Sequence, residues 1–158
     1  MTYIVVTNDD GVNAPGIFAL AQAMRQLGTV QVIAPSKNQS ATGHKKTLFQ
    51  DILVGKSVWP DRTEAITIDS SPADCIALAA LGLVAWPPHL VVSGINRGGN
   101  MGQDITYSGT VTAALEAAIQ GVPAIAISVA NRDANDPADY VAAAKVAVHV
   151  ARRVLEKG

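Results

Sequence analysis

Uncharged runs rich in β-branched residues alternate along the chain with stretches rich in alanine and leucine. Short apolar runs bounded by turn residues indicate buried strands, and longer stretches that begin at a capping residue indicate helices. The pattern predicts strands over residues 2–7, 30–34, 52–54, 65–68, 90–93 and 124–129. It predicts helices over residues 16–27, 72 to about 83, 110–120 and 137–156.

This alternation of strands and helices is typical of an α/β protein with a mostly parallel sheet and right-handed crossovers. We therefore expect a Rossmann-like, three-layer α/β fold. The chain contains no internal repeat, low-complexity tract or linker, so residues 1–158 are predicted to form one domain.

Polar side chains gather in the loops that follow three of the predicted strands. In open parallel sheets, ligands bind beyond the carboxyl ends of the strands, where the strand order reverses. If the order is Rossmann-like, the strands at residues 2–7 and 90–93 are neighbours, and their loops face one crevice. The polar residues of the three loops include Asn8, Asp9, Asp10, Ser40, Asn96, Asn100 and Ser108.

Asp9 and Asp10 are adjacent carboxylates at the end of a strand. Two anions this close are unfavourable unless a cation bridges them or one is protonated. Oxygen ligands from Asp, Ser and Asn favour a hard divalent cation, Mg²⁺ or Mn²⁺, over zinc. The alternative is structural, since Asp-Asp-Gly also suits a tight turn before a helix.

The segment Tyr107-Ser108-Gly109-Thr110 precedes a predicted helix. Hydroxyls and free backbone N–H groups at a helix N-terminus form an anion site suited to phosphate, although an ordinary Ser/Thr cap has the same sequence. The glycines nearby match neither the dinucleotide-binding pattern nor the P-loop pattern. A nicotinamide-dependent oxidoreductase or a nucleoside triphosphatase is therefore not predicted.

Charge and cysteine content narrow the partners and the compartment. The formal net charge is −1, which provides no general attraction for a nucleic-acid polymer or an anionic membrane. Residues 75–96 lack Asp, Glu, Lys and Arg, but prolines interrupt them, and we expect a helix followed by a strand rather than a membrane span. With a single cysteine, Cys75, no internal disulfide is possible, and the cytoplasm is the expected location.

The polar loops carry motifs that resemble those of the survival protein E (SurE) nucleotidases. The motifs include Thr7-Asn8-Asp9-Asp10-Gly11, Ala34-Pro35 with Asn38-Gln39-Ser40, Pro72-Ala73-Asp74-Cys75, Ser93-Gly94-Ile95-Asn96 and Tyr107-Ser108-Gly109-Thr110-Val111. They run in family order from residue 2 to about residue 129. Family members usually continue into a C-terminal extension, which the sequence of 158 residues is expected to lack.

The resemblance implies a metal-dependent phosphatase that removes phosphate from nucleoside 5′- or 3′-monophosphates. It implies a metal site formed by Asp9, Asp10, Ser40 and Asn96. For substrate and phosphate, the expected contacts are Asn8, Ser40, Gly43, Asn96, Asn100, Ser108, Gly109 and Thr110. Asp9 is expected to orient or deprotonate the attacking water, while Ser108 and Thr110 hold the phosphoryl oxygens.

Two further expectations concern the molecule as a whole. A non-catalytic domain that binds nucleotide or phosphate, or that serves assembly, is the alternative to the enzyme. The last predicted helix carries Val146, Val148, Val150 and Val154 among alanines. Because a helix that is apolar nearly all round is normally buried on more than one side, we expect a homodimer or a larger homo-oligomer.

Overall fold

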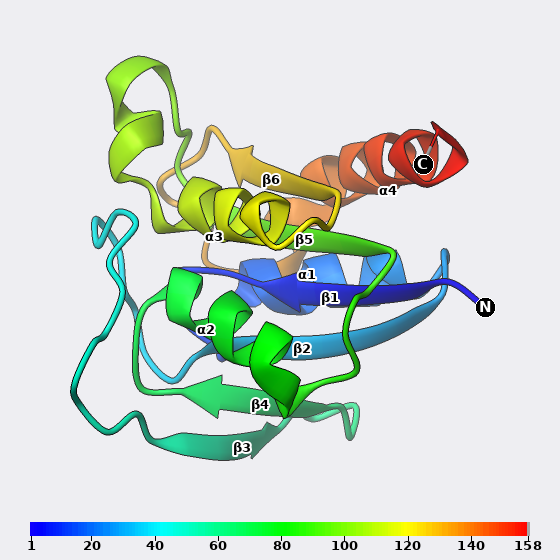
Figure 1. The fold of residues 1–158 in the computed structure, drawn as a ribbon. Helices are drawn as coiled ribbons and strands as arrows, with labels where there is room; N and C mark the ends of the chain where they lie inside the picture. The colour runs from blue at the N-terminus through cyan, green and yellow to red at the C-terminus, as the bar shows by residue number, and fades with distance from the viewer. Residues whose placement is uncertain (158) are drawn as a thin grey trace.

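The computed structural model describes residues 1–157, and in that part of the chain the strands form one six-stranded sheet with helices on both faces (Figure 1). The strands are β1 (Tyr3–Thr7), β2 (Thr29–Pro35), β3 (Val54–Val58), β4 (Glu64–Ile68), β5 (Leu90–Arg97) and β6 (Ala124–Val129). The α-helices are α1 (Pro15–Met24), α2 (Pro72–Leu78), α3 (Gly109–Ile119) and α4 (Val141–Lys157). Shorter helical segments are the π-helical η1 (Ala79–Leu83) and the 3₁₀-helical η2 (Gly102–Tyr107) and η3 (Pro137–Tyr140).

The sheet has the strand order β3-β4-β2-β1-β5-β6. Every neighbouring pair is parallel except β3 and β4, which confirms the predicted Rossmann-like α/β fold. From β1 the chain adds β2 and β4 on one side and β5 and β6 on the other. The strand order therefore reverses between β1 and β5. In parallel sheets this is the position at which ligands bind.

The register between β1 and β5 aligns the loops that follow them. Thr7, the last residue of β1, pairs with Ser93 in β5. Because the two strands are parallel, the chain after Thr7 and the chain after Ser93 leave from the same edge of the sheet.

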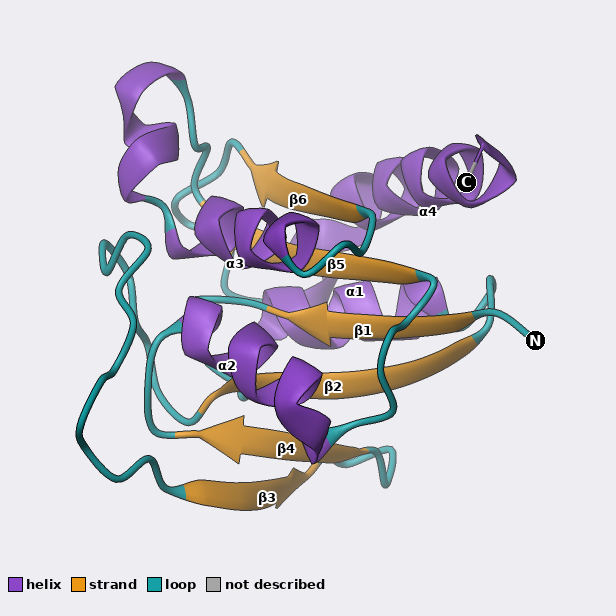
Figure 2. Ribbon diagram, viewed as in Figure 1, coloured by secondary structure: helices purple, strands orange, loops and turns teal. Residues whose placement is uncertain are grey.

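The two faces of the sheet are covered by different helices. Helices α1 and α4 pack together on one face, and α2 and α3 pack together on the other (Figure 2). Successive residues of a strand point to opposite faces, so Ile4 and Val6 of β1 pack toward α1 and α4. Val5, which lies between them, packs toward α2 and α3.

Several predicted elements differ from those observed. The helix predicted over residues 16–27 ends at Met24, and the helices predicted over 72–83 and 137–156 are each divided into an α-helix and a shorter helical segment. The strand predicted over residues 52–54 begins at Val54 and runs to Val58, as an edge strand whose exposed positions mask the usual alternation. Strand β5 continues to Arg97, past the predicted end at Ser93, because the segment after Gly94 pairs again with β6. The predicted loop 94–109 also contains η2.

The last helix is amphipathic, so the expectation that it is apolar nearly all round is wrong. Ala147, Val148 and Ala151 are buried against the core, whereas Lys145 and His149 are exposed. The charged residues of the helix are all exposed, together with Val141 and Val146. Over residues 1–157, no helix is both long and apolar enough to cross a membrane.

Candidate active site

The carboxylate of Asp9 lies at the end of β1, against the first turn of α3. Its exposed fraction is 3%, and the hydroxyl of Thr110 donates a hydrogen bond of 2.7 Å to Asp9 Oδ1. Gly109 permits this approach, because a Cβ atom there would lie 2.8 Å from Asp9 Cβ. The structure thus brings together the first and third polar loops, as predicted.

Asp10 turns toward β5. The backbone N–H of Arg97 donates a hydrogen bond of 3.0 Å to Asp10 Oδ2. This contact joins the ends of β1 and β5 directly and confirms that their loops face one another.

Both carboxylates are less acidic than ordinary aspartates. Burial raises the pKa of Asp9, the charge of Asp10 raises it further, and the hydrogen bond from Thr110 opposes the shift. Burial also raises the pKa of Asp10, against the effects of the Arg97 backbone N–H and side-chain charge. A bound cation would oppose both shifts by stabilising the charged form of each carboxylate.

The loop after β2 is tied to the same place. The backbone N–H of Gln39 donates a hydrogen bond of 2.7 Å to the carbonyl oxygen of Asp9. The backbone N–H of Ser40 in turn bonds to Asn38 Oδ1 at 2.7 Å. These contacts place Ser40 near Asp9, in agreement with the prediction that the polar loops face one crevice.

A cavity of about 470 Å³ opens beside these loops. Of the predicted site residues it is lined by Asp9, Ser40, Asn96, Asn100 and Ser108. Polar atoms contribute heavily to this lining, and they come from all three loops. The convergence inferred from the sheet topology is therefore realised as a single cavity.

Five predicted site residues do not line this cavity. Asp10 lines a neighbouring cavity of about 360 Å³, together with Lys37, Arg97 and Tyr140. Asn8 is fully buried, and its amide nitrogen donates to the carbonyl oxygen of Gly11 at 2.8 Å. The others are Gly43, Gly109 and Thr110.

The side chains of Asn96 and Asn100 are each oriented by a hydrogen bond that the amide nitrogen donates. Asn96 Nδ2 donates to the carbonyl oxygen of Gly98 at 2.7 Å, and Asn100 Nδ2 donates to Ser128 Oγ at 2.7 Å. Among residues 1–157 neither amide oxygen accepts a hydrogen bond, so each is available to a ligand.

Ser108 and Thr110 have different positions, although both were expected to hold phosphate. Ser108 caps α3 by accepting a hydrogen bond of 3.2 Å from the backbone N–H of Val111, and it lines the cavity. Thr110 is fully buried behind Asp9 and donates its hydroxyl to that carboxylate. Its side chain is placed to orient Asp9 rather than to contact a ligand.

Two arginines on the cavity wall were missed by the sequence reasoning. Arg97 is the last residue of β5, and Arg132 belongs to the loop after β6. Both guanidinium groups are suited to a phosphorylated ligand. The position of Arg132 could have been inferred from the sequence, because this residue also follows the carboxyl end of a predicted parallel strand.

The comparison with known proteins decides the family. The model of the family described as "Survival protein SurE" matches residues 4–158. The chain belongs to the SurE family. It is 50% identical over 155 residues to a protein of Geobacter sulfurreducens named 5′-nucleotidase SurE. The aligned region covers 98% of this chain and 57% of that protein. A protein of the same name from Pelobacter propionicus is 47% identical and covers 99% and 61%, respectively.

A solved SurE structure shares the fold. The crystal structure of the SurE protein from Aquifex aeolicus aligns with a TM-score of 0.87 at 40% identity, over 99% of this chain and 61% of that one. The chain thus spans about three fifths of the length of the SurE proteins that it matches.

The residues present fit the divalent cation that the SurE resemblance implies. Within residues 1–157 no three His, Cys, Asp or Glu side chains cluster as a metal site. A cation here would therefore be held by two carboxylates and by neutral oxygen atoms, the ligand set that suits Mg²⁺ or Mn²⁺. The raised pKa values of Asp9 and Asp10 agree with this, because two adjacent carboxylates, one buried and one half-buried, are stabilised in their charged forms by a cation.

Proposed function

We propose that the chain hydrolyses nucleoside 5′-monophosphates with the help of Mg²⁺ or Mn²⁺ held by Asp9, Asp10, Ser40 and Asn96. One observation carries the proposal: two adjacent carboxylates lie where the strand order reverses, the buried Asp9 against the N-terminus of α3 and the half-buried Asp10 against the end of β5. The names of the SurE relatives support this substrate class. Hydrolysis of 3′-monophosphates is the extension that the same site would allow.

The residues around the cavity suggest how each would contribute. A bound cation would offset phosphate charge and lower the pKa of a water molecule. Asp9, held by Thr110, would orient that water and accept its proton. Ser108 and the backbone N–H groups at the start of α3 would bind the phosphoryl oxygens as their charge increases. Arg97 and Arg132 would add positive charge along the wall.

Phosphate release from 5′-AMP tests the proposal. We expect activity in Mn²⁺ or Mg²⁺, none after chelation with EDTA, and recovery when the metal is restored. Asp10→Asn should weaken metal binding strongly because it removes one of two anionic ligands. Asn96→Ala removes a neutral ligand and should weaken it less.

Two results would count against the enzyme. Turnover that persists in EDTA would contradict the role of the metal. Metal-dependent binding of 5′-AMP without hydrolysis, measured by calorimetry, would instead identify a non-catalytic nucleotide-binding domain.

We further propose that the chain forms a homodimer or a larger homo-oligomer in the cytoplasm. A groove of about 610 Å³ between α1 and α4 is lined mainly by apolar atoms, from residues such as Phe18, Val141 and Val148. Exposed apolar surface of this kind commonly marks an interface. The cytoplasmic location is supported by the one cysteine, Cys75, which is free and buried.

A further inference from the structure

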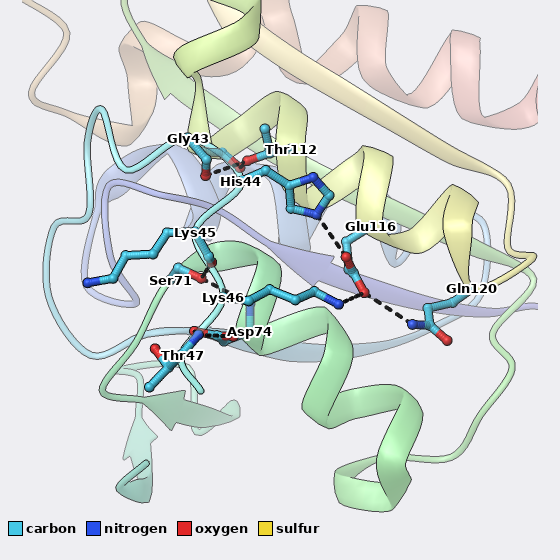
Figure 3. Close-up of polar contacts among 11 residues, drawn as sticks. Gly43, His44, Lys45, Lys46, Thr47, Ser71, Asp74, Thr112, Glu116 and Gln120 are labelled. Atoms are coloured by element: carbon cyan, nitrogen blue, oxygen red, sulfur yellow. Dashed lines mark hydrogen bonds and ion pairs between the residues drawn. The ribbon is translucent and has the colours of Figure 1, made fainter. Parts of the chain in front are cut away.

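A buried acid on α3 has no part in the chemistry proposed above. Glu116 is fully buried, and its carboxylate accepts hydrogen bonds of 2.8 Å from Lys46 Nζ and 3.1 Å from Gln120 Nε2. His44 Nε2 lies 2.8 Å from the other carboxylate oxygen (Figure 3). Gln120 directly follows the last residue of α3, whereas His44 and Lys46 come from the long loop between β2 and β3.

The charge of Glu116 depends on these contacts. Burial alone would raise the pKa of Glu116, but the hydrogen bonds from Lys46, Gln120 and His44 outweigh it and hold the pKa below its usual value. A buried carboxylate that loses its partners is strongly destabilising. Glu116 therefore favours the conformation in which the loop lies against α3.

The tie extends through residues 43–47, which we call the anchor segment. The Thr112 hydroxyl donates to the carbonyl oxygen of Gly43 at 2.9 Å, and the Ser71 hydroxyl donates to that of Lys45. The backbone N–H of Thr47 donates to both carboxylate oxygens of Asp74 at 3.1 Å. Every residue of the anchor segment is thus bonded to α2, α3 or the residues just before α2 (Figure 3).

The anchor segment lies just after a proposed ligand of the metal. Upstream, the backbone N–H of Gln39 is bonded to the carbonyl oxygen of Asp9. Downstream, the loop is fixed from Gly43 onward, also by the bond from the Gly43 N–H to the carbonyl oxygen of Tyr107 at 3.1 Å. Only Ser40 and its two successors lie between these fixed points, so both ties together determine where Ser40 meets the cavity.

We infer that Glu116 is a positioning residue, which holds the anchor segment through His44 and Lys46 and so keeps Ser40 in place to bind metal and substrate. This inference rests on the proposed function for the role of Ser40. A residue that only stabilises the core would not act in this way. Loss of the contacts from Glu116 to His44 and Lys46 should change ligand binding more than it changes the chemical step.

The decisive variant is the double substitution His44→Ala with Lys46→Met, which removes both contacts of the loop with Glu116 and leaves the residues of α3 unchanged. The matched control is Gln120→Ala, which removes a partner of the same carboxylate without touching the loop. Three quantities are measured: the Kd for Mn²⁺ by calorimetry, the rate of tryptic cleavage after Lys45, and kcat and KM for 5′-AMP. The first two do not require activity.

We expect the double variant to raise the Kd for Mn²⁺ and the KM roughly tenfold, as for loss of hydrogen bonds to a charged group. Cleavage after Lys45 should accelerate, while kcat should change much less. Gln120→Ala should leave all of these near the wild-type values. Shifts in cleavage and Kd in a protein that lacks phosphatase activity would support the anchor and contradict only the proposed function.

A folded double variant with unchanged cleavage and unchanged Kd would overturn the inference. If the double variant fails to fold, Thr112→Val takes its place, since it removes the contact to Gly43 and leaves Glu116 untouched. A smaller rise in Kd and in cleavage is then expected, and wild-type values for both would overturn the inference.

Discussion

The two faces of the sheet are held in different ways. Toward α1 and α4 the contacts are apolar, and none of the fully buried polar or charged side chains within residues 1–157 belongs to either helix. Toward α2 and α3, buried side chains such as Asp74, Thr112 and Glu116 make hydrogen bonds to a loop. Apolar burial is not directional, whereas hydrogen bonds fix the positions of atoms. We conclude that both faces supply apolar packing, and that the face covered by α2 and α3 also supplies the directional contacts that place the site.

The largest effect is expected at the site itself. Asp9→Asn should lower the rate of phosphate release roughly a hundredfold to ten-thousandfold, the range for loss of general acid–base catalysis. The same variant should melt at a higher temperature than the wild type in EDTA at neutral pH. Because the folded-state pKa of Asp9 is raised, the stability linked to its protonated form is lost as the pH rises through that pKa.

Phosphate release and thermal melting in EDTA check this prediction together. Full activity would contradict the role of Asp9. A lower melting temperature would contradict the view that its buried charge destabilises the metal-free chain.

The opposite face should respond in stability alone. Leu20 of α1 is fully buried, and Leu20→Ala should lower the free energy of unfolding by about 2–5 kcal/mol. Urea denaturation measures this change. At a temperature where both proteins are folded, kcat and the Kd for Mn²⁺ should be unchanged; a selective change in either would show that the two faces are coupled.

A smaller effect is expected at the start of α3. Ser108→Ala should lower kcat/KM. The loss should correspond to about 1–3 kcal/mol of transition-state stabilisation, as for a lost hydrogen bond to a charged group. It should also cost about 1 kcal/mol of stability because the helix loses its cap. The affinity for Mn²⁺, measured by calorimetry, serves as the control. Its collapse would make Ser108 a metal ligand.

Acid should separate the two faces. Hydrogen bonds outweigh burial and lower the pKa values of Glu116 and Asp74, so the stability they add is present above their unfolded-state values of 4.5 and 3.8. It is lost as the pH falls through the lower folded-state values. Hydrogen exchange should therefore show residues 43–47 losing protection on acidification before α1 does. Simultaneous loss would contradict the difference between the faces.

The smallest effect concerns the apolar groove. Val141 lines it, whereas Val146 lies on the same helix outside it, and both are exposed. Val141→Lys should shift the proposed oligomer toward monomers on dilution, while Val146→Lys should not. Either substitution should change stability by no more than about 0.5 kcal/mol. Light scattering across a dilution series measures the shift, and equal behaviour of the two variants would exclude the groove as the interface.

Much of the fold follows from local pattern. The buried strands at β1, β2 and β6 have apolar sequences bounded by turn residues, and the parallel pairing of β1 with β5 follows from the alternation with helices. Once the parallel pairings of β1 with β2 and with β5 are accepted, the loops that carry Asp9, Ser40 and Asn96 are expected to lie at one edge of the sheet. These residues could therefore be predicted to meet without any knowledge of side-chain contacts.

Other features depend on the path of individual loops. Nothing in the sequence around His44 indicates that it would reach Glu116, which lies 72 positions away. The position of Thr110 behind Asp9 likewise depends on how closely α3 approaches β1. The one local signal was Glu116 itself, the only charged residue in α3.

Two glycines near the cavity differ in how much room a larger side chain would have. A Cβ atom at Gly109 would collide with Asp9 and also lie 3.1 Å from Pro72, so no larger residue fits there while α3 keeps its place. At Gly99, which lines the cavity, an added Cβ would make ordinary contacts of 3.6 Å or more, chiefly with the flexible Met101 side chain. Divergence or design that alters which phosphate ester is accepted has room at the wall that includes Gly99 and little at the start of α3.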